Sequence, residues 1–159
     1  MIDKLLNEVL RIMSDDWREV IAEWKGDLAF SGRNEAGGTV QMGTLDGQPG
    51  LSPMELLLAG MAGCTGIDIV NILRKKRKQI DEFQVRVRGK RADKPPKVYT
   101  EIEVTYLLWG EKLDSKAVEQ AIQLSEEKYC SASVMLGAVA KIHSEYKIMR
   151  SGEKESSQE

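Results

Sequence analysis

Apolar and polar positions recur along the chain with two periods, one typical of helices and one of strands. In residues 1–14 the apolar positions have helical spacing, which predicts an amphipathic helix packed on the body of the protein or on a partner. Residues 19–32 alternate loosely and favour strand structure. Glycines then punctuate short runs such as GTVQM up to residue 50, a pattern typical of an antiparallel meander.

The clearest boundary in the sequence is LSPMELLL, which predicts the start of a long helix. Ser52 suits the N-cap, Pro53 suits the first helical position, and Glu55 completes an S-x-x-E capping box. The helix is predicted to continue to RKKRK at residues 74–78, where cations interact favourably with the carboxyl end of the helix dipole. Its apolar length invites a transmembrane interpretation, but Asp68 and several glycines interrupt it and favour a buried helix of a soluble protein.

Strict alternation follows in EFQVRVRGK, residues 82–90, and VYTEIEVTYLL, residues 98–108. These two runs predict a hairpin with apolar side chains inward, and with the arginines of one strand facing the glutamates of the other on the outer side. The remaining predicted elements are a helix capped by Asp114 and running to about Lys128, a shorter helix over 129–136, and a last strand over 140–149.

The order of these elements predicts an α+β fold in which mostly antiparallel sheets surround a long buried central helix. A chain of 159 residues is long enough to bury one core. Because neither internal repeats nor a linker interrupt it, we expect an amino-terminal amphipathic helix over 1–14, a single domain over 15–150, and a disordered polar tail over 151–159.

Composition excludes several classes of function. Charged residues make up 30% of the chain and the formal net charge is -2, which argues against nucleic-acid and membrane partners, and the basic run at 74–78 is best interpreted as a solvated helix end. Charges throughout the amino-terminal segment argue against a signal peptide and predict a cytoplasmic protein. Two cysteines and one histidine are too few for a structural zinc site, so we expect no metal and no cofactor.

Small residues surround Cys64 within the long helix, although each glycine costs a helix about 1 kcal/mol relative to alanine. Close approach of a second copy of the helix in a dimer would compensate for this cost. Cys64 lies beyond the reach of the helix dipole, so the residues alone favour an inert core cysteine over a reactive one. Cys130 lies where one helix is predicted to end and another to begin, with Lys128 nearby, and both features favour its thiolate.

The stretch LSPMELLLAGMAGCTGIDIVNILRKKR, followed later by SEEKYCSASVML, resembles the OsmC/Ohr family in its OsmC-like (YhfA-like) branch, from about Trp24 to Met149. The resemblance implies an intertwined homodimer with central helices packed together and active sites at the subunit interface. Characterised members reduce organic hydroperoxides. A peroxidatic cysteine becomes a sulfenic acid, a resolving cysteine captures it as a disulfide, and a dithiol reductant of lipoyl or thioredoxin type restores both thiols. Carried over, Cys64 is the peroxidatic cysteine and Cys130 the resolving one.

The sequence departs from this family at the activating residues. Efficient family peroxidases place a glutamate directly after the motif proline, where it holds an arginine against the thiolate, whereas this chain has Met54. Glu55 is the next residue, and the capping box already accounts for it. FSGRNEAGG offers Arg33 as a candidate thiolate stabiliser, in a setting similar to that of the family arginine; an exposed turn arginine is the alternative.

Two further polar residues receive structural interpretations. Asp68 would disfavour a neighbouring thiolate, so we expect it to form a hydrogen bond at the dimer contact. His143 alternates outward on the last strand and is interpreted as a surface residue. The leading hypothesis is a thiol-dependent peroxidase that reduces organic hydroperoxides. The alternative, motivated by Met54, is a non-peroxidatic dimer that binds a small apolar or thiol-reactive ligand.

Overall fold

The structure is a computed structural model that describes residues 17–153, and the chain divides into two compact units, Met1–Pro53 and Met54–Glu159. The predicted helix over 1–14 lies outside the described residues, as do residues 154–159 of the predicted tail. The predicted domain over 15–150 spans parts of both units, and each unit is described by itself.

The amino-terminal unit is the meander that the glycine spacing predicts. Strands β1 (Val20–Gly26), β2 (Ala29–Asn34) and β3 (Thr39–Met42) form an antiparallel sheet in that order, and β4 (Thr44–Leu45) pairs with β5 (Gln48–Pro49). Residues 19–32 are two strands because Gly26 and Asp27, both at positive φ, reverse the chain between them. A Cβ on Gly43 would lie 2.6 Å from the Leu28 carbonyl oxygen, so only glycine fits there.

The sheet of this unit buries few of its apolar side chains. Ala29 is buried, but Trp24 is 66% exposed and Leu28 is 90% exposed. Val20, Ile21 and Val40 are also exposed. A small sheet becomes stable when another layer covers an apolar face, so these side chains mark a surface that a packing partner can cover.

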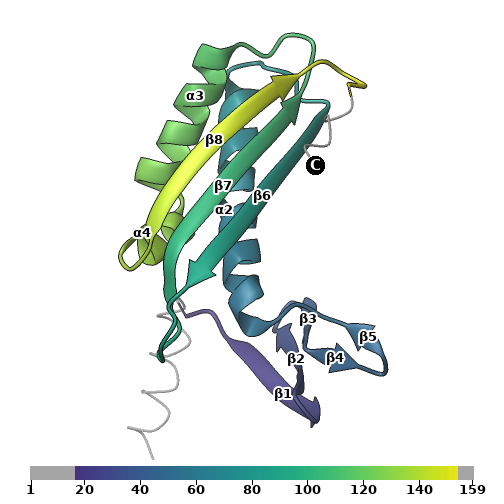
Figure 1. Cartoon of the computed structure of the whole chain (residues 1–159). Helices are drawn as coiled ribbons and strands as arrows, with labels where there is room; N and C mark the ends of the chain where they lie inside the picture. Colours follow the sequence, from purple (N-terminus) through teal and green to yellow (C-terminus); the bar gives the residue numbers. More distant parts are fainter. Residues whose placement is uncertain (1–16, 154–159) are drawn as a thin grey trace, which may run out of the picture. The chain divides into compact units, whose positions relative to one another are not determined.

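The carboxyl-terminal unit is a three-stranded sheet with helices on one face (Figure 1). The long helix α2 (Pro53–Lys75) begins at the predicted residue. Strand order is β6-β7-β8, with an antiparallel pair β6/β7 and a parallel pair β7/β8. The other elements are β6 (Glu82–Arg91), β7 (Tyr99–Trp109), α3 (Ser115–Leu124), the π-helical turn η1 (Ser125–Tyr129), α4 (Ser131–Gly137) and β8 (Lys141–Met149).

The core of this unit lies between the sheet and the helices α2 and α3, and the predicted inward residues of the hairpin belong to it. Ile102, Val104 and Tyr106 on β7 are buried, and Val85 and Val87 on β6 pack against them. On the outer side Arg88 stands opposite Glu103 and forms the predicted cross-strand ion pair. Alternation along the two strands therefore predicts both faces correctly.

Helix α2 is buried along one face only. Within the single chain, the predicted burial of this helix is therefore seen on the face toward the sheet and not on the opposite face. Met61, Thr65, Ile69 and Leu73 recur every four residues and face the core, whereas Ile67 is 65% exposed. By length and composition α2 could cross a membrane, a test that core helices of soluble proteins also pass.

The two ends of α3 differ in how well the sequence predicts them. Asp114 is the N-cap, and its carboxylate accepts a hydrogen bond of 2.9 Å from the Ala117 N–H. At the other end α3 stops at Leu124, and the helix predicted to reach Lys128 continues as the π-helical turn η1. Lys76 and Lys78 of the basic run reach Gln120 and Asp114, contacts that fit the interpretation of this run as a helix end.

Candidate functional site

Helix α2 places Cys64 and Asp68 on one side of the helix, because residues four apart lie about one turn above each other. Both side chains are half-buried. Thr65, next to Cys64, is fully buried, and its hydroxyl donates to the Met61 carbonyl within the same helix. The thiol and the carboxylate thus lie at the edge of the buried face of α2.

Cys130 enters the same site from the junction of η1 and α4. Its N–H donates a 2.7 Å hydrogen bond to the Ser125 carbonyl, which closes the π-helical turn. Its Sγ accepts a 3.3 Å hydrogen bond from the Ser133 N–H and so caps α4. Cys130 is fully buried. The π-helical turn, a feature that is often found at functional sites, therefore fixes the direction of this thiol.

The structure brings the two predicted cysteines together. The Sγ atoms of Cys64 and Cys130 and a carboxylate oxygen of Asp68 all lie within 4.8 Å of one another, and both cysteines are free thiols. Cys64 is partly exposed whereas Cys130 is fully buried, so Cys64 is the more accessible of the two residues. The arrangement is a dithiol with one outer and one inner sulfur.

Burial raises the pKa of the Cys130 thiol, Ser133 opposes this effect by hydrogen bonding to the sulfur, and neighbouring Cys64 raises the pKa further. The sequence-based expectation that Cys130 favours its thiolate is therefore wrong. Lys128 is the cation that was expected to favour this thiolate. Its ammonium lies instead over the Tyr129 ring, 5.6 Å from the ring centre.

Asp68 has a partner within the chain. Its Oδ2 accepts a 3.2 Å hydrogen bond from the hydroxyl of Ser125, the first residue of η1, and Ser125 is fully buried. The expected hydrogen bond thus exists between α2 and η1 of the chain itself. The sequence gives no signal for Ser125, because fifty-seven positions separate it from Asp68.

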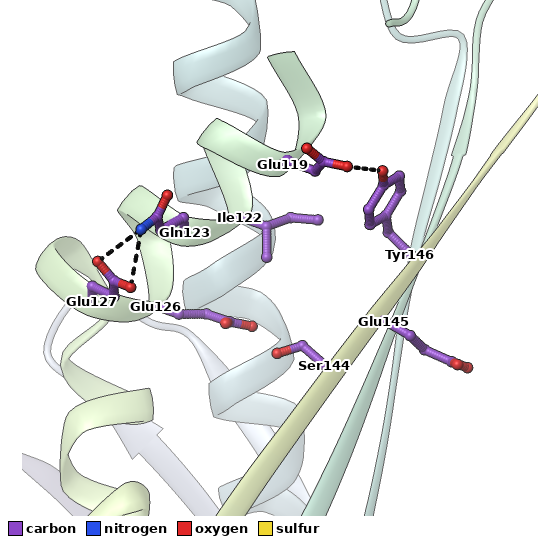
Figure 2. A pocket seen from close by; sticks show the side chains of 8 residues that line it. All are labelled: Glu119, Ile122, Gln123, Glu126, Glu127, Ser144, Glu145 and Tyr146. Atoms are coloured by element: carbon purple, nitrogen blue, oxygen red, sulfur yellow. Dashed lines mark hydrogen bonds between the residues drawn. The ribbon is translucent and has the colours of Figure 1, made fainter. Parts of the chain in front are cut away.

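A second polar contact joins β7 to η1. The buried Tyr106 hydroxyl donates a 3.0 Å hydrogen bond to Glu126, and its pKa is raised by burial and by that carboxylate. Beyond it, an open pocket of about 320 Å³ lies between α3, η1 and β8 (Figure 2). Its lining is acidic and contains neither cysteine: Glu119, Ile122, Gln123, Glu126, Glu127, Ser144, Glu145 and Tyr146.

The start of α2 shows what occupies the family glutamate position. Met54 is half-buried and packs against the core, and its carbonyl accepts a 2.9 Å hydrogen bond from the Tyr99 hydroxyl. Glu55 is exposed. An apolar side chain that packs against the core therefore stands where the resemblance implies an activating carboxylate.

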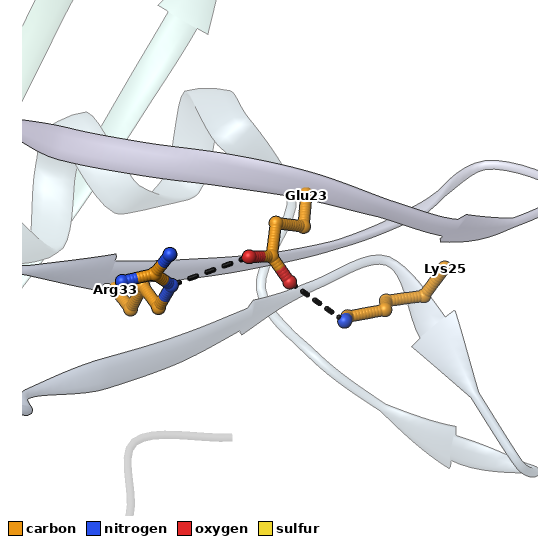
Figure 3. A network of polar contacts seen from close by, with 3 residues as sticks. All are labelled: Glu23, Lys25 and Arg33. Carbon is orange, nitrogen blue, oxygen red and sulfur yellow. Dashed lines mark hydrogen bonds and ion pairs between the residues drawn. The ribbon is translucent and has the colours of Figure 1, made fainter.

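Arg33 lies in strand β2 of the amino-terminal unit, just before the turn in which the sequence analysis placed it. Its Nε is 3.2 Å from Oε1 of Glu23 on the paired strand β1, and the Lys25 ammonium is 2.9 Å from the other oxygen of that carboxylate (Figure 3). Lys25 and then Arg33 lower the pKa of Glu23. All three side chains are exposed, as is His143 on β8, in agreement with its surface interpretation.

The family model described as "OsmC-like protein" matches residues 45–145, which include both cysteines and Asp68. The chain belongs to the OsmC family. Protein YhfA of Escherichia coli (strain K12) is 33% identical over 127 residues, which cover 80% of this chain and 95% of YhfA. These two findings confirm the resemblance to the family and to its YhfA-like branch.

Solved structures agree with this family assignment. A hypothetical protein from Aquifex aeolicus VF5 superposes with a TM-score of 0.76 at 36% identity, covering 85% of this chain and 98% of that one. The organic hydroperoxide resistance protein OhrB of Bacillus subtilis has a TM-score of 0.58 at 21% identity, covering 82% of this chain and 98% of OhrB. The α+β fold with its long helix is thus that of OsmC-like proteins.

Proposed function

We propose that this OsmC-family protein is a thiol-dependent peroxidase for organic hydroperoxides, with Cys64 as nucleophile and Cys130 as resolving thiol. One observation carries the proposal. Two free thiols from distant segments lie within 4.8 Å, the first half-buried and the second fully buried. The proposed chemistry requires this arrangement, because the peroxide must reach Cys64 from solvent and the Cys130 sulfur must lie close enough to form a disulfide afterwards.

In the first step the Cys64 thiolate attacks the peroxide oxygen that carries hydrogen. The O–O bond breaks, the alkoxide leaves and takes a proton to become the alcohol, and Cys64 becomes a sulfenic acid. Cys130 then attacks the Cys64 sulfur after loss of its own proton. The sulfenic oxygen leaves as water, and a disulfide forms. A dithiol reductant of lipoyl or thioredoxin type reduces that disulfide by exchange and becomes oxidised itself.

The setting of Cys64 favours organic over inorganic peroxides. Small and apolar residues flank it on α2, and Ile67, three positions away, is 65% exposed. An alkyl group can shed water against such a surface, whereas hydrogen peroxide has no apolar part to bury. The family includes organic hydroperoxide resistance proteins of the same fold, among them OhrB of Bacillus subtilis.

Arg33 is the proposed cation for the Cys64 thiolate. In family peroxidases a glutamate after the motif proline holds the arginine; here the carboxylate that Arg33 contacts is Glu23 on β1. We assign to Glu23 the positioning role that Met54 cannot perform. The Lys25 side chain contacts the same carboxylate and serves as an internal comparison, since it lies in the same cluster but has no proposed part in catalysis.

A homodimer with active sites at the subunit interface is part of the proposal. Within the chain, a Cβ added to Gly60 or Gly63 would meet nothing within 4 Å, so packing in one chain gives no reason for glycine there. The exposed face of α2 also carries Ile67, and the amino-terminal sheet leaves Trp24 and Leu28 exposed. A second copy that covers these surfaces accounts for all of them. We place the dimer in the cytoplasm, where thiols stay reduced.

Met54 favours a second candidate function, a non-peroxidatic dimer that binds a small apolar or thiol-reactive ligand. Without the family glutamate, the two thiols can still bind a small molecule or form an adduct with it, although peroxide turnover is lost. Native mass spectrometry of protein purified from its source tests this candidate. A co-purified ligand or thiol adduct supports it, and bare protein contradicts it.

Stopped-flow mixing of the reduced protein with cumene hydroperoxide, and separately with hydrogen peroxide, tests the peroxidase. Mass spectrometry of quenched samples scores the disulfide between Cys64 and Cys130. We expect fast, stoichiometric disulfide formation with the organic peroxide and slower reaction with hydrogen peroxide. Cys64→Ser should abolish turnover, whereas Cys130→Ser should consume one equivalent and then stall. Continued turnover by Cys64→Ser would contradict the assignment.

A further inference from the structure

The two thiols share their site with a carboxylate whose presence peroxide chemistry alone does not explain. A carboxylate oxygen of Asp68 lies within 4.8 Å of both sulfurs. Two thiolates and a carboxylate become favourable together when a cation lies between them. The three side chains thus form a donor set that a cation can bind once the thiols release their protons.

We propose that reduced Cys64 and Cys130, together with Asp68, bind a divalent cation of the zinc type. Thiolate ligands select soft and borderline metals over magnesium and calcium, which prefer oxygen. Among residues 17–153 these three side chains are the one group of cysteine, histidine and acidic residues arranged to hold a metal ion. The sequence analysis counted only cysteine and histidine, and the packing of η1 on α2 adds the third ligand.

The geometry needs only small adjustments. Ligand atoms around a tetrahedral zinc ion are about 3.5–3.8 Å apart, given bond lengths of about 2.0–2.3 Å. The three atoms of this site lie within 4.8 Å of one another. Side-chain rotations that move these atoms by about 1 Å bring them to the spacing of zinc ligands. Cys64 and Asp68 come from successive turns of one helix, which keeps two of the three ligands on one rigid element.

Outer contacts already orient two of the ligands. Ser125 donates to Oδ2 of Asp68, and the Ser133 N–H donates to the Cys130 sulfur, the kind of contacts that fix metal ligands in place. The buried Ser133 hydroxyl has no hydrogen-bond partner among the described residues. Three protein ligands leave the fourth position of a tetrahedral ion open for water or a small anion.

Metal binding and disulfide formation exclude each other, because both use the same two sulfurs. A bound ion therefore protects the thiols and inhibits peroxide reduction, and this consequence alone rests on the proposed function. Binding itself requires only the reduced dithiol and Asp68. Its measurement is thus independent of whether the protein turns over a peroxide.

Anaerobic titration of the reduced full-length protein with Co²⁺ tests the site. We expect one ion per chain, the ultraviolet charge-transfer absorption of cobalt bound by two thiolates, the visible bands of tetrahedral cobalt, and displacement of Co²⁺ by Zn²⁺. Asp68→Asn, which keeps the size of the side chain, should weaken binding at least tenfold. Glu127→Gln, a matched loss of charge on the exposed side of η1, should bind as the parent does.

The controls separate this inference from the peroxidase. Cys64→Ser and Cys130→Ser should each lose the two-thiolate absorption, and circular dichroism verifies that every variant is folded. Absence of the charge-transfer absorption in the parent, or equal affinity of parent and Asp68→Asn, overturns the inference. Slow oxidation by peroxides together with tight Co²⁺ binding would reject the proposed function and leave the metal site standing.

Discussion

The hydroxyl of Ser125 donates a 3.2 Å hydrogen bond to the carboxylate of Asp68 and so joins the middle of α2 to the first residue of η1. Ser125 also accepts the Cys130 N–H through its carbonyl. One residue thus links the helix of the outer thiol to the turn of the inner thiol.

Removal of this link should lower stability measurably. Ser125→Ala deletes the donor to Asp68 within a buried region, and we expect the free energy of unfolding to fall by about 1 kcal/mol, the usual net worth of such a bond. Urea denaturation followed by circular dichroism measures the change. Ser144→Ala, at an exposed serine on β8, is the matched control and should change stability by less than about 0.5 kcal/mol. Equal effects of both substitutions would contradict the structural role of Ser125.

The inner thiol should titrate above the ordinary range. In Cys64→Ser, where Cys130 is the remaining thiol, we expect a pKa above the usual value of about 8.5, because burial disfavours the thiolate. The ultraviolet absorbance of the thiolate against pH measures it. A pKa at or below 8.5 would show that some group favours the Cys130 thiolate after all.

The same shift predicts how stability depends on pH. The folded chain holds the Cys130 proton at pH values where the unfolded chain has released it. The stabilisation is therefore complete below the ordinary thiol pKa and is lost as pH rises through the raised one. We expect the free energy of unfolding of Cys64→Ser to decline above about pH 8.5, and to decline less when Cys130 is replaced by alanine as well.

The cluster around Glu23 should affect the rate of Cys64 oxidation. Arg33→Met should slow the first step about tenfold or more, because it removes the cation proposed to stabilise the Cys64 thiolate. Glu23→Gln should slow it less, since the arginine remains but is no longer held. Lys25→Met, the matched control on the same carboxylate, should react like the parent. Unchanged stopped-flow kinetics in Arg33→Met would exclude the arginine from the reaction.

Substitution of a glycine in α2 should show whether two α2 helices pack together in a dimer. In a single chain a Cβ added at Gly63 meets nothing within 4 Å. Both Gly63→Ala and Gly63→Leu should therefore stabilise the isolated helix, by up to about 1 kcal/mol. In a dimer with crossed helices, the leucine side chain would block close approach of the two α2 helices, whereas the small alanine side chain would disturb their packing only slightly. We expect light scattering to show a dimer for the parent and for Gly63→Ala, and monomers with a lower Tm for Gly63→Leu. A stable, dimeric Gly63→Leu would place the interface elsewhere.

Local sequence signals predicted much of the fold because they act between near neighbours. The start of α2 at Pro53, the N-cap at Asp114 and the alternation of β6 and β7 each depend on residues that are close in sequence or paired across a hairpin. Where a tertiary contact outweighed the local pattern, prediction failed. The end of α3 became a π-helical turn that aims Cys130 inward, whereas the split of residues 19–32 into two strands follows from the local turn at Gly26.

The sequence by itself indicated most helices and strands, the family and the two candidate cysteines, since these follow from periodicity, capping and short motifs. Only the tertiary structure decided that the two sulfurs lie within 4.8 Å and that Cys130 is the buried cysteine. It also decided that Asp68 of α2 lies beside both sulfurs and accepts a hydrogen bond from Ser125 of η1. The physical reason is that packing of α2, η1 and α4 on the sheet sets distances between distant segments. No local preference contains those distances, because each emerges only when the whole core is buried.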